Sequence, residues 1–238
     1  MRPYVIIPAR MRATRLPGKP LADIGGKAMI VHVMERAQAA NIGPVAVACS
    51  EDEVYQAVTD AGGVAVMTDP DLPSGTDRVR AAINKLDAIS AYDIVVNVQG
   101  DMPTLNPSLI ETIIQPFNNP AVDMTTAAVE TRDKREMTDP NVVKAIIAAD
   151  GRALYFTRTC APSGPGPVFH HLGLYGYRRA ALNTFCDLAP SPLETRERLE
   201  QLRALEAGLR INVVMTEDAP HGVDTPDDLK RARMIIKD

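Results

Sequence analysis

The stretch YVIIPARMRATRLPGKPL, residues 4–21, joins an apolar run to a turn rich in positive charge. Its first four residues have the continuous hydrophobicity of a strand that is buried on both faces, and Pro8 ends the run. In an open parallel sheet, ligands bind at the edge where the strands end. The turn therefore lies where a ligand is expected. Its basic residues are Arg10, Arg12, Arg15 and Lys19, with no acidic residue among them.

Clustered positive charges repel one another unless an anion neutralises them, and phosphate groups do this well. The turn therefore predicts a phosphate site, and a triphosphate fits its charge. The alternative is a solvated basic loop that contacts an acidic surface. Because the turn matches neither GxxxxGK[ST] nor GxGxxG, it is neither a P-loop nor a dinucleotide fingerprint.

Length and composition indicate an ordinary globular chain. At 238 residues, with 45% hydrophobic and 24% charged residues, it suits one α/β domain over 1–238, in which about 120–215 forms a subregion. A formal charge of -4 argues against a nucleic-acid binder and a membrane-surface binder. We see neither a signal peptide nor a membrane span, and the three cysteines match no zinc spacing, so we expect a cytoplasmic protein without membrane insertion.

Over the first hundred residues, short apolar runs alternate with segments of helical periodicity, which predicts a Rossmann-like, doubly wound and mostly parallel sheet. The expected strands are Tyr4–Ile7, Val45–Cys49, Val64–Met67 and Ile94–Val98, and the expected helices are Ala28–Asn41, Glu51–Ala61 and Asp77–Ala88.

After about residue 120, short strands separated by turns predict a smaller antiparallel extension. The strands expected there are Met124–Val129, Val142–Ala149, Ala153–Phe156, Leu172–Tyr177 and Arg210–Met215. Helices are expected at Arg179–Asp187, Leu193–Ala207 and Pro226–Ile236.

The segment DIVVNVQGDMP, residues 93–103, reads as a buried strand that ends in Gln99, Gly100 and Asp101. Gly100 allows the backbone to approach a ligand closely. A carboxylate at this edge, facing nucleotide phosphates, is a typical Mg²⁺ ligand, so Asp101 is a candidate metal residue. The alternative is that Asp101 only starts a turn before Pro103.

Two further segments contain candidate residues at helix starts. In PSGTDR, residues 73–78, Ser74, Thr76 and Arg78 stand where amide donors favour anions, although Thr76 has the equally good alternative of being only a helix cap. In GVDTPDDL, residues 222–229, helix-start chemistry leaves Asp224 unexplained. Asp224 is a second metal carboxylate if the chain returns to Asp101, but composition alone favours a turn residue.

Seven segments occur in order along nearly the whole chain: PARxxxTRLPGKPL, SGTDR, NVQGD, ALYFTR, HLGLYGYR, LEQLRALE and GVDTPDDL. Together they resemble the 3-deoxy-manno-octulosonate cytidylyltransferases, which have the nucleotide-diphospho-sugar transferase type of fold. The resemblance implies that the sugar 3-deoxy-D-manno-octulosonate (Kdo) reacts with CTP to give CMP-Kdo and pyrophosphate, for lipopolysaccharide or capsule synthesis. It also implies a requirement for Mg²⁺ and a homodimer.

The resemblance also implies roles for individual residues. The catalytic residues are expected to be Arg10, Arg15, Lys19 and Asp101. Nucleotide contacts are expected from these three cations and from Pro8, Ala9, Ser74, Thr76 and Arg78. The metal would be held by Asp101 and Asp224. The sugar would be held by Gln99, Arg158, His171, Tyr175, Glu200 and Gln201.

The chain departs from the family pattern on the sugar side. It has Ala13, Met102 and His170 where the family usually has Ser, Glu and Arg, and a shorter stretch follows Arg158. An alternative substrate is therefore an amino-Kdo or another acidic sugar. Two alternatives from other classes are a nucleotide-binding module without turnover and a nicotinamide oxidoreductase. The chain lacks the GxGxxG turn that is typical of the second.

Overall fold

The computed structural model describes residues 1–11, 15–217 and 219–237. The expected phosphate ligand Arg12 lies outside the described residues. The chain forms two compact units, one from Met1–Glu111 with Pro220–Asp238 (unit 1) and the other from Thr112–Ala219 (unit 2). Unit 2 is thus an insertion in the sequence of unit 1. The expectation of one domain with a subregion at about 120–215 stays a prediction.

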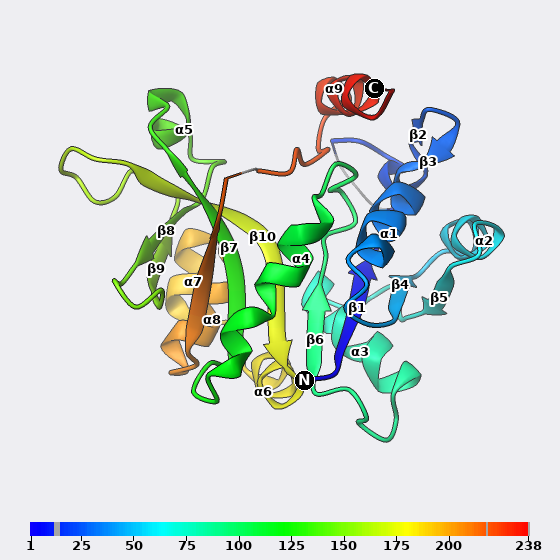
Figure 1. Cartoon of the computed structure of the whole chain (residues 1–238), viewed down its shortest axis with the longest axis horizontal. Coiled ribbons are helices and arrows are strands. Elements are labelled where there is room, and N and C mark those ends of the chain that lie inside the picture. Colours follow the sequence, from blue (N-terminus) through cyan, green and yellow to red (C-terminus); the bar gives the residue numbers. More distant parts are fainter. Residues whose placement is uncertain (12–14, 218, 238) are drawn as a thin grey trace. The chain divides into compact units, whose positions relative to one another are not determined.

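Unit 1 is built on four parallel strands in the order β6-β1-β4-β5 (Figure 1). Their bounds are Pro3–Pro8 for β1, Val45–Cys49 for β4, Val64–Met67 for β5 and Ile94–Asn97 for β6. Val5 lies at the centre, opposite Val45 on one side and Val96 on the other, and is fully buried. Since the strands are parallel, their carboxyl ends share one edge.

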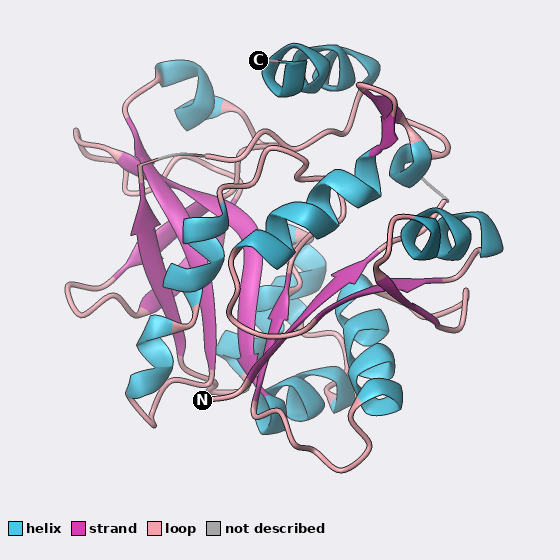
Figure 2. Cartoon of the chain, turned by 45° about the vertical axis from the view of Figure 1, so that its right-hand side comes forward, coloured by secondary structure: helices cyan, strands magenta, loops and turns pink. Residues whose placement is uncertain are grey.

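Helices α1 (Met29–Ala39), α2 (Asp52–Asp60) and α3 (Gly75–Leu86) are the crossovers of unit 1 and pack against its strands (Figure 2). Two short strands, β2 (Asp23–Ile24) and β3 (Lys27–Ala28), pair beside α1. Between β1 and β2 lies the 3-10 turn η1 (Lys19–Leu21).

The last helix, α9 (Pro226–Lys237), belongs to unit 1. Its Leu229 and Ala232 join Ile24, Met29 and Val223 in one buried cluster. Burial of apolar side chains is the main source of such cohesion, so this cluster fixes the segment that leads into α9. Helix α4 (Pro107–Ile113) follows β6 across the boundary in sequence.

Unit 2 has a mixed sheet, in which β11 (Ile211–Thr216) runs parallel to β7 (Met124–Thr131). The remaining pairs are antiparallel: β10 (Val168–Arg178) pairs with β7 and β8 (Lys144–Ile147), and β8 pairs with β9 (Ala153–Thr157). Its helices are η2 (Gln115–Asn118), α5 (Lys134–Thr138), α6 (Arg179–Asp187), α7 (Pro192–Glu197) and α8 (Gln201–Glu206).

The single helix expected at Leu193–Ala207 is wrong, because the chain breaks it between α7 and α8. Arg198 adopts the left-handed conformation, with φ 57° and ψ 47°. The break lets Arg203 form two short bonds to the Glu194 carboxylate, 2.5 and 2.8 Å long. In a straight helix these residues, nine apart, would be separated by about 13 Å. A long-range ion pair thus replaces continuous helix.

The expected α/β fold class, parallel in the first half with an antiparallel extension, is confirmed. The elements that the sequence pattern did not predict are short: β2, β3, α4, α5 and the two 3-10 turns. In the part of the chain that the structure describes, no helix combines the length and the apolar composition that a bilayer crossing needs.

Candidate functional site

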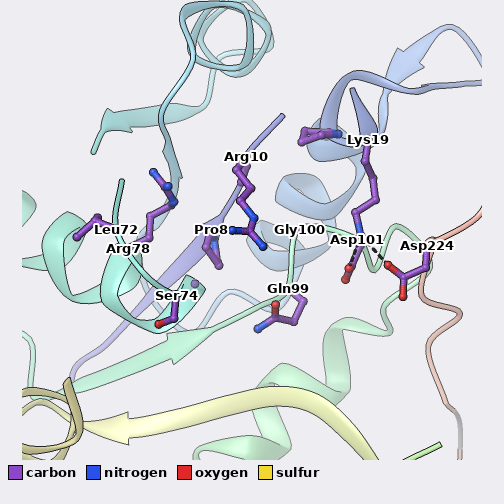
Figure 3. Close-up of a pocket in the computed structure, with 13 residues that line it drawn as sticks. Pro8, Arg10, Lys19, Leu72, Ser74, Arg78, Gln99, Gly100, Asp101 and Asp224 are labelled. Atoms are coloured by element: carbon purple, nitrogen blue, oxygen red, sulfur yellow. Dashed lines mark hydrogen bonds and ion pairs between the residues drawn. The ribbon is translucent and has the colours of Figure 1, made fainter. Parts of the chain in front are cut away.

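A cavity of about 310 Å³ opens in unit 1 beside the carboxyl ends of β1 and β6 (Figure 3). Its lining residues are Pro8, Ala9, Arg10, Lys19, Pro20, Leu72, Ser74, Gly75, Arg78, Gln99, Gly100, Asp101 and Asp224. Most of the residues expected to bind nucleotide or metal are therefore together in one cavity, and Gln99, expected on the sugar side, joins them. Arg15 and Thr76 are not among the lining residues. Leu72 is a lining residue that sequence reasoning missed.

Gly100 lines the cavity where the chain that follows β6 meets the end of β1. A Cβ at this position would stand 2.7 Å from the carbonyl oxygen of Pro8, closer than Cβ atoms approach real neighbours. Glycine is thus required for close approach of the chain after β6 to the end of β1. The sequence predicted a close approach to a ligand. In the structure the tight neighbour is backbone, and because Gly100 also lines the cavity, its approach to a ligand stays a prediction.

Lys19 lies between the two predicted metal carboxylates. Its Nζ is 2.7 Å from Oδ2 of Asp101 and 3.0 Å from Oδ1 of Asp224, as the dashed lines in Figure 3 show. Burial lowers the pKa of Lys19, but the two carboxylates outweigh this effect and raise the pKa overall. Arg15 adds a more exposed ion pair of 2.9 Å to Oδ2 of Asp224. Lys19 is thus a charged ammonium shared by Asp101 and Asp224.

The main chain holds these two carboxylates together. The amide of Val223 donates a 2.9 Å hydrogen bond to the carbonyl oxygen of Asp101. The Asp228 carboxylate accepts bonds from the amides of Asp224 and Thr225 and from the Thr225 hydroxyl, which together lower the pKa of Asp228 against the opposing effect of burial. The start of α9, whose capping chemistry the sequence analysis identified, therefore fixes the backbone of Asp224. The Asp224 carboxylate is directed at Lys19.

The amino end of α3 forms another wall of the cavity. Ser74 is the N-cap, and its Oγ accepts a 3.1 Å hydrogen bond from the amide of Asp77. The cap alternative for Thr76 is therefore wrong, because Thr76 lies in the first turn and is 4% exposed. Side-chain caps satisfy helix N–H groups that otherwise lack partners, and these groups favour nearby anions.

Arg78 crosses from α3 to the cavity and is held by a residue that sequence reasoning missed. Its Nη1 donates a hydrogen bond to Oγ1 of Thr68, which itself donates to the carbonyl oxygen of Cys49 at 2.9 Å. Burial lowers the pKa of Arg78, and the nearby Glu51 opposes this. Thr68 comes directly after β5, so the same sheet edge that forms the cavity also orients the guanidinium. A lone threonine after a strand carries no distinctive sequence signal.

The lining of the cavity offers Mg²⁺ two carboxylate ligands, Asp101 and Asp224. Over residues 1–11, 15–217 and 219–237, no group of three or more His, Cys, Asp or Glu side chains is placed to hold a metal. Asp101 and Asp224 nevertheless converge on one positive charge. Mg²⁺ bound to nucleotides commonly takes one or two carboxylates and completes its shell with waters and phosphate oxygens. These two aspartates therefore suit a metal that arrives with phosphates.

Most residues expected to bind the sugar lie in unit 2. His171 on β10 contacts Oγ1 of Thr126 at 2.9 Å and packs at 5.5 Å from the Tyr175 ring. Burial lowers the pKa of His171 to about 3, and burial together with the Glu200 charge raises that of Tyr175. The amide Nε2 of Gln201 is buried without a hydrogen-bond partner among the described residues. His171 and Tyr175 thus form an aromatic pair beside the charge of Glu200, and Gln201 adds a donor without a partner among the described residues.

The guanidinium of Arg158, also in unit 2, donates hydrogen bonds to backbone carbonyl groups. Its Nε, Nη1 and Nη2 donate to the carbonyl oxygens of Glu197, Pro140 and Arg198. The fully buried Lys144 donates to the carbonyls of Asp139 and of Arg158 itself. Arg158 therefore ties two loops of unit 2 together, and its expected contact with the sugar stays a prediction.

Comparison with known proteins places the chain in a family. Residues 4–211 match the model of the cytidylyltransferase family. A 3-deoxy-manno-octulosonate cytidylyltransferase from Rhodopseudomonas palustris is 57% identical over 98% of this chain and 96% of its own length. The enzymes of the same name from Nitrobacter winogradskyi and Paramagnetospirillum magneticum are 56% and 54% identical over 99% and 100% of this chain, and over 94% and 98% of their own lengths.

Two solved structures are similar to this chain over its full length. The structure of CMP:2-keto-3-deoxy-manno-octonic acid synthetase complexed with CTP is 38% identical, covers 100% of this chain and 99% of its own, and has a TM-score of 0.93. A 4-diphosphocytidyl-2C-methyl-D-erythritol synthase from Anaerococcus prevotii, 13% identical over 100% of this chain and 99% of its own, has a TM-score of 0.66 and shares the fold. The expected family is confirmed, and the chain belongs to the 3-deoxy-manno-octulosonate cytidylyltransferases.

Proposed function

We propose that this chain catalyses the reaction of CTP with Kdo to give CMP-Kdo and pyrophosphate. The observation that carries the proposal is the unit 1 cavity, in which cations and the amino end of α3 face two aspartates at one sheet edge. The full-length similarity to enzymes of this name supports the choice of sugar, and the relative bound to CTP supports the choice of base.

The cations of the cavity suit a triphosphate. Arg10 and Lys19 line it from the turn after β1, and Arg78 lines it from α3 (Figure 3). In the reaction, charge develops on the α-phosphate and on the departing pyrophosphate. Positive groups that are already in place stabilise this charge without reorganisation, which lowers the barrier. Backbone groups of Pro8 and Ala9, also in the lining, are proposed to read the cytosine.

We propose Asp101 and Asp224 as the residues that hold Mg²⁺. When bound there, Mg²⁺ would neutralise phosphate charge and lower the pKa of the attacking hydroxyl. The oxygen of the anomeric hydroxyl forms a bond to the α-phosphorus, and its O–H bond breaks with transfer of the proton to water. The bond from this phosphorus to the bridging oxygen of the β-phosphate breaks, and pyrophosphate leaves with the electron pair. The contribution of the protein is mainly position and charge.

Sugar recognition is assigned to His171, Tyr175, Glu200 and Gln201, all in unit 2. A sugar rich in hydroxyl groups needs donors and acceptors at fixed positions, and the Nε2 of Gln201, which has no partner within the described ranges, is such a donor. His171, with its depressed pKa, is a neutral partner that can accept or donate one hydrogen bond. A cytoplasmic location and a homodimeric state, both implied by the family, complete the proposal.

The test is pyrophosphate release from purified protein with CTP, Kdo and Mg²⁺. We expect release only with all three, and much less with UTP, GTP or ATP. Asp101→Asn should lower kcat/KM by about two to three orders of magnitude, the loss expected for a metal ligand, with little change in stability. Asp227→Asn is the matched control, because Asp227 pairs only with Lys230 on the surface of α9 among the described residues.

Other outcomes overturn parts of the proposal. Release with a different acidic sugar would reject Kdo while keeping cytidylyl transfer. CTP binding without release for any sugar would favour a nucleotide-binding module. Near-normal turnover of Asp101→Asn would remove Asp101 from the catalytic residues. Light scattering that gives the mass of one chain would reject the homodimer.

A further inference from the structure

The Lys19 ammonium lies where the proposed metal would make its protein contacts. It bonds to Asp101 and Asp224 at the same time, at 2.7 and 3.0 Å, and its side chain is 17% exposed. Charged hydrogen bonds of this length are among the stronger ones in proteins, and partial burial reduces screening by water. A metal ion that bridges Oδ2 of Asp101 and Oδ1 of Asp224 would take the place of the ammonium.

The backbones of all three residues are held in place, and their side chains differ in length. Asp101 is fixed through its carbonyl by the amide of Val223, and Asp224 through its amide by Asp228. The backbone of Lys19 is also fixed, because its amide bonds to the carbonyl of Leu16 and the next residue is the buried Pro20. Its four-carbon side chain, however, lies along the cavity wall and has rotatable bonds throughout. The lysine can turn to another anion while the carboxylates stay in place.

We propose that Lys19 acts as a placeholder cation, which closes the Asp101–Asp224 pair to metal until a nucleotide's phosphates draw the ammonium away. The inference rests on the proposed function. A triphosphate in the cavity offers Lys19 new anionic partners and offers a metal additional oxygen ligands. Nucleotide and metal therefore bind together, and the free protein binds the metal weakly.

The charge balance supports this order of binding. In the free protein the two aspartates are neutralised by Lys19 and by Arg15, which is 2.9 Å from Asp224. A divalent ion alone would leave Lys19 without its anions in a partly buried place, which is costly. With phosphates present, every charge keeps a partner.

The experiment measures Mn²⁺ binding to the nucleotide-free protein by electron paramagnetic resonance, with Mn²⁺ in place of Mg²⁺. We expect Lys19→Met to bind Mn²⁺ about tenfold or more tightly than the wild type, a difference of about 1.4 kcal/mol. Arg15→Met is the matched control. It removes the same charge from the same turn but leaves Asp101 paired with Lys19, so its binding should change less than threefold.

A second readout covers the case in which the variant folds poorly. Ligands that bind only the native state raise the midpoint of thermal unfolding. Mn²⁺ should therefore raise the midpoint of Lys19→Met, and of Lys19→Gln, more than that of the wild type. The double variant Lys19→Met with Asp101→Asn should lose the gain in binding.

Three results would overturn the proposal. They are tight Mn²⁺ binding by the nucleotide-free wild type, no gain in Lys19→Met and Lys19→Gln by either readout, and a gain that survives Asp101→Asn. None of these measurements uses turnover. A wild type that releases no pyrophosphate would reject the proposed function, whereas the absence of a gain in Mn²⁺ binding would reject the placeholder alone.

Discussion

Individual residues at the sheet edge differ in how far the sequence reveals them. Arg10, Lys19 and Asp101 were predictable, because parallel strands end at one edge and each residue directly follows a strand or its turn. For Asp224 the local pattern favoured a turn residue and only the family resemblance named it, whereas Thr68 was not predicted at all. The place of Asp224 depends on the bond between Val223 and Asp101, and that of Thr68 on its contact with Arg78, which no local spacing specifies.

Gln201 offers a direct test of the sugar-side assignment at this scale. Its Nε2 is buried without a partner among the described residues, so removal of the amide costs the folded protein no hydrogen bond there. For Gln201→Leu we expect unchanged or slightly higher stability and a KM for Kdo raised about tenfold, the cost of one lost hydrogen bond. The KM for CTP should stay the same.

Steady-state kinetics with each substrate varied in turn, together with urea unfolding, separates the outcomes. A fall in stability with an unchanged KM for Kdo would show that Gln201 is a structural residue. Leu202→Met serves as the control, since it changes a fully buried apolar neighbour without changing the hydrogen-bonding groups.

Among the elements, the crossovers of unit 1 followed the sequence pattern closely, since helical and strand periodicities alternate cleanly there. Expected and observed bounds agree for β4 and β5, and differ by a few residues for α1 to α3. The α7–α8 break escaped prediction for a physical reason. The run LETRERLEQLRALE is amphipathic throughout, and the kinked form is favoured by long-range contacts that no local pattern specifies, such as those of Arg203 with Glu194 and the Phe185 ring and of Arg158 with the carbonyl of Arg198.

The break makes a prediction about Arg198. A non-glycine residue in the left-handed region costs roughly 1–2 kcal/mol, whereas glycine adopts it freely at some cost in unfolded-state entropy. Arg198→Gly should therefore raise the free energy of unfolding by about 0.5–1 kcal/mol. Arg196→Gly, inside α7, should lower it by about 1 kcal/mol.

Urea unfolding followed by far-UV circular dichroism checks both changes, and it suits a chain that contains no tryptophan. Equal destabilisation by the two glycines would mean that the backbone at 198 is not strained. Activity should be unchanged in Arg196→Gly if α7 only supports the unit 2 loops.

For the whole molecule, the buried His171 predicts how stability depends on pH. Burial, together with the charge of His170, lowers the pKa of His171 to about 3 in the folded protein, against about 6.5 in an unfolded chain. Below pH 6.5 the unfolded chain therefore binds more protons, so the free energy of unfolding falls as the pH falls. From pH 7 to pH 5 this one group should remove about 2 kcal/mol.

His171→Asn should remove most of that dependence, whatever its effect on stability at pH 7. Urea unfolding at pH 7, 6 and 5 measures the slope while most carboxyl groups remain ionised. His170→Asn is the comparison, and should change the slope less, because burial lowers the pKa of His170 while Glu136, 3.8 Å away, opposes it. Equal slopes for the wild type and His171→Asn would contradict the prediction.

The bond between the Val223 amide and the Asp101 carbonyl joins two segments that the ribosome makes at different times. A ribosome makes the cationic turn and Asp101 early, then all of unit 2, and only afterwards the segment from Pro220 that carries Asp224 and α9. Domains generally fold as their chain emerges, so the strands of unit 1 can assemble while one aspartate is still unmade. The nascent protein thus has its phosphate-facing charges before its carboxylate pair, and a chain cut short after unit 2 would leave Lys19 with Asp101 alone.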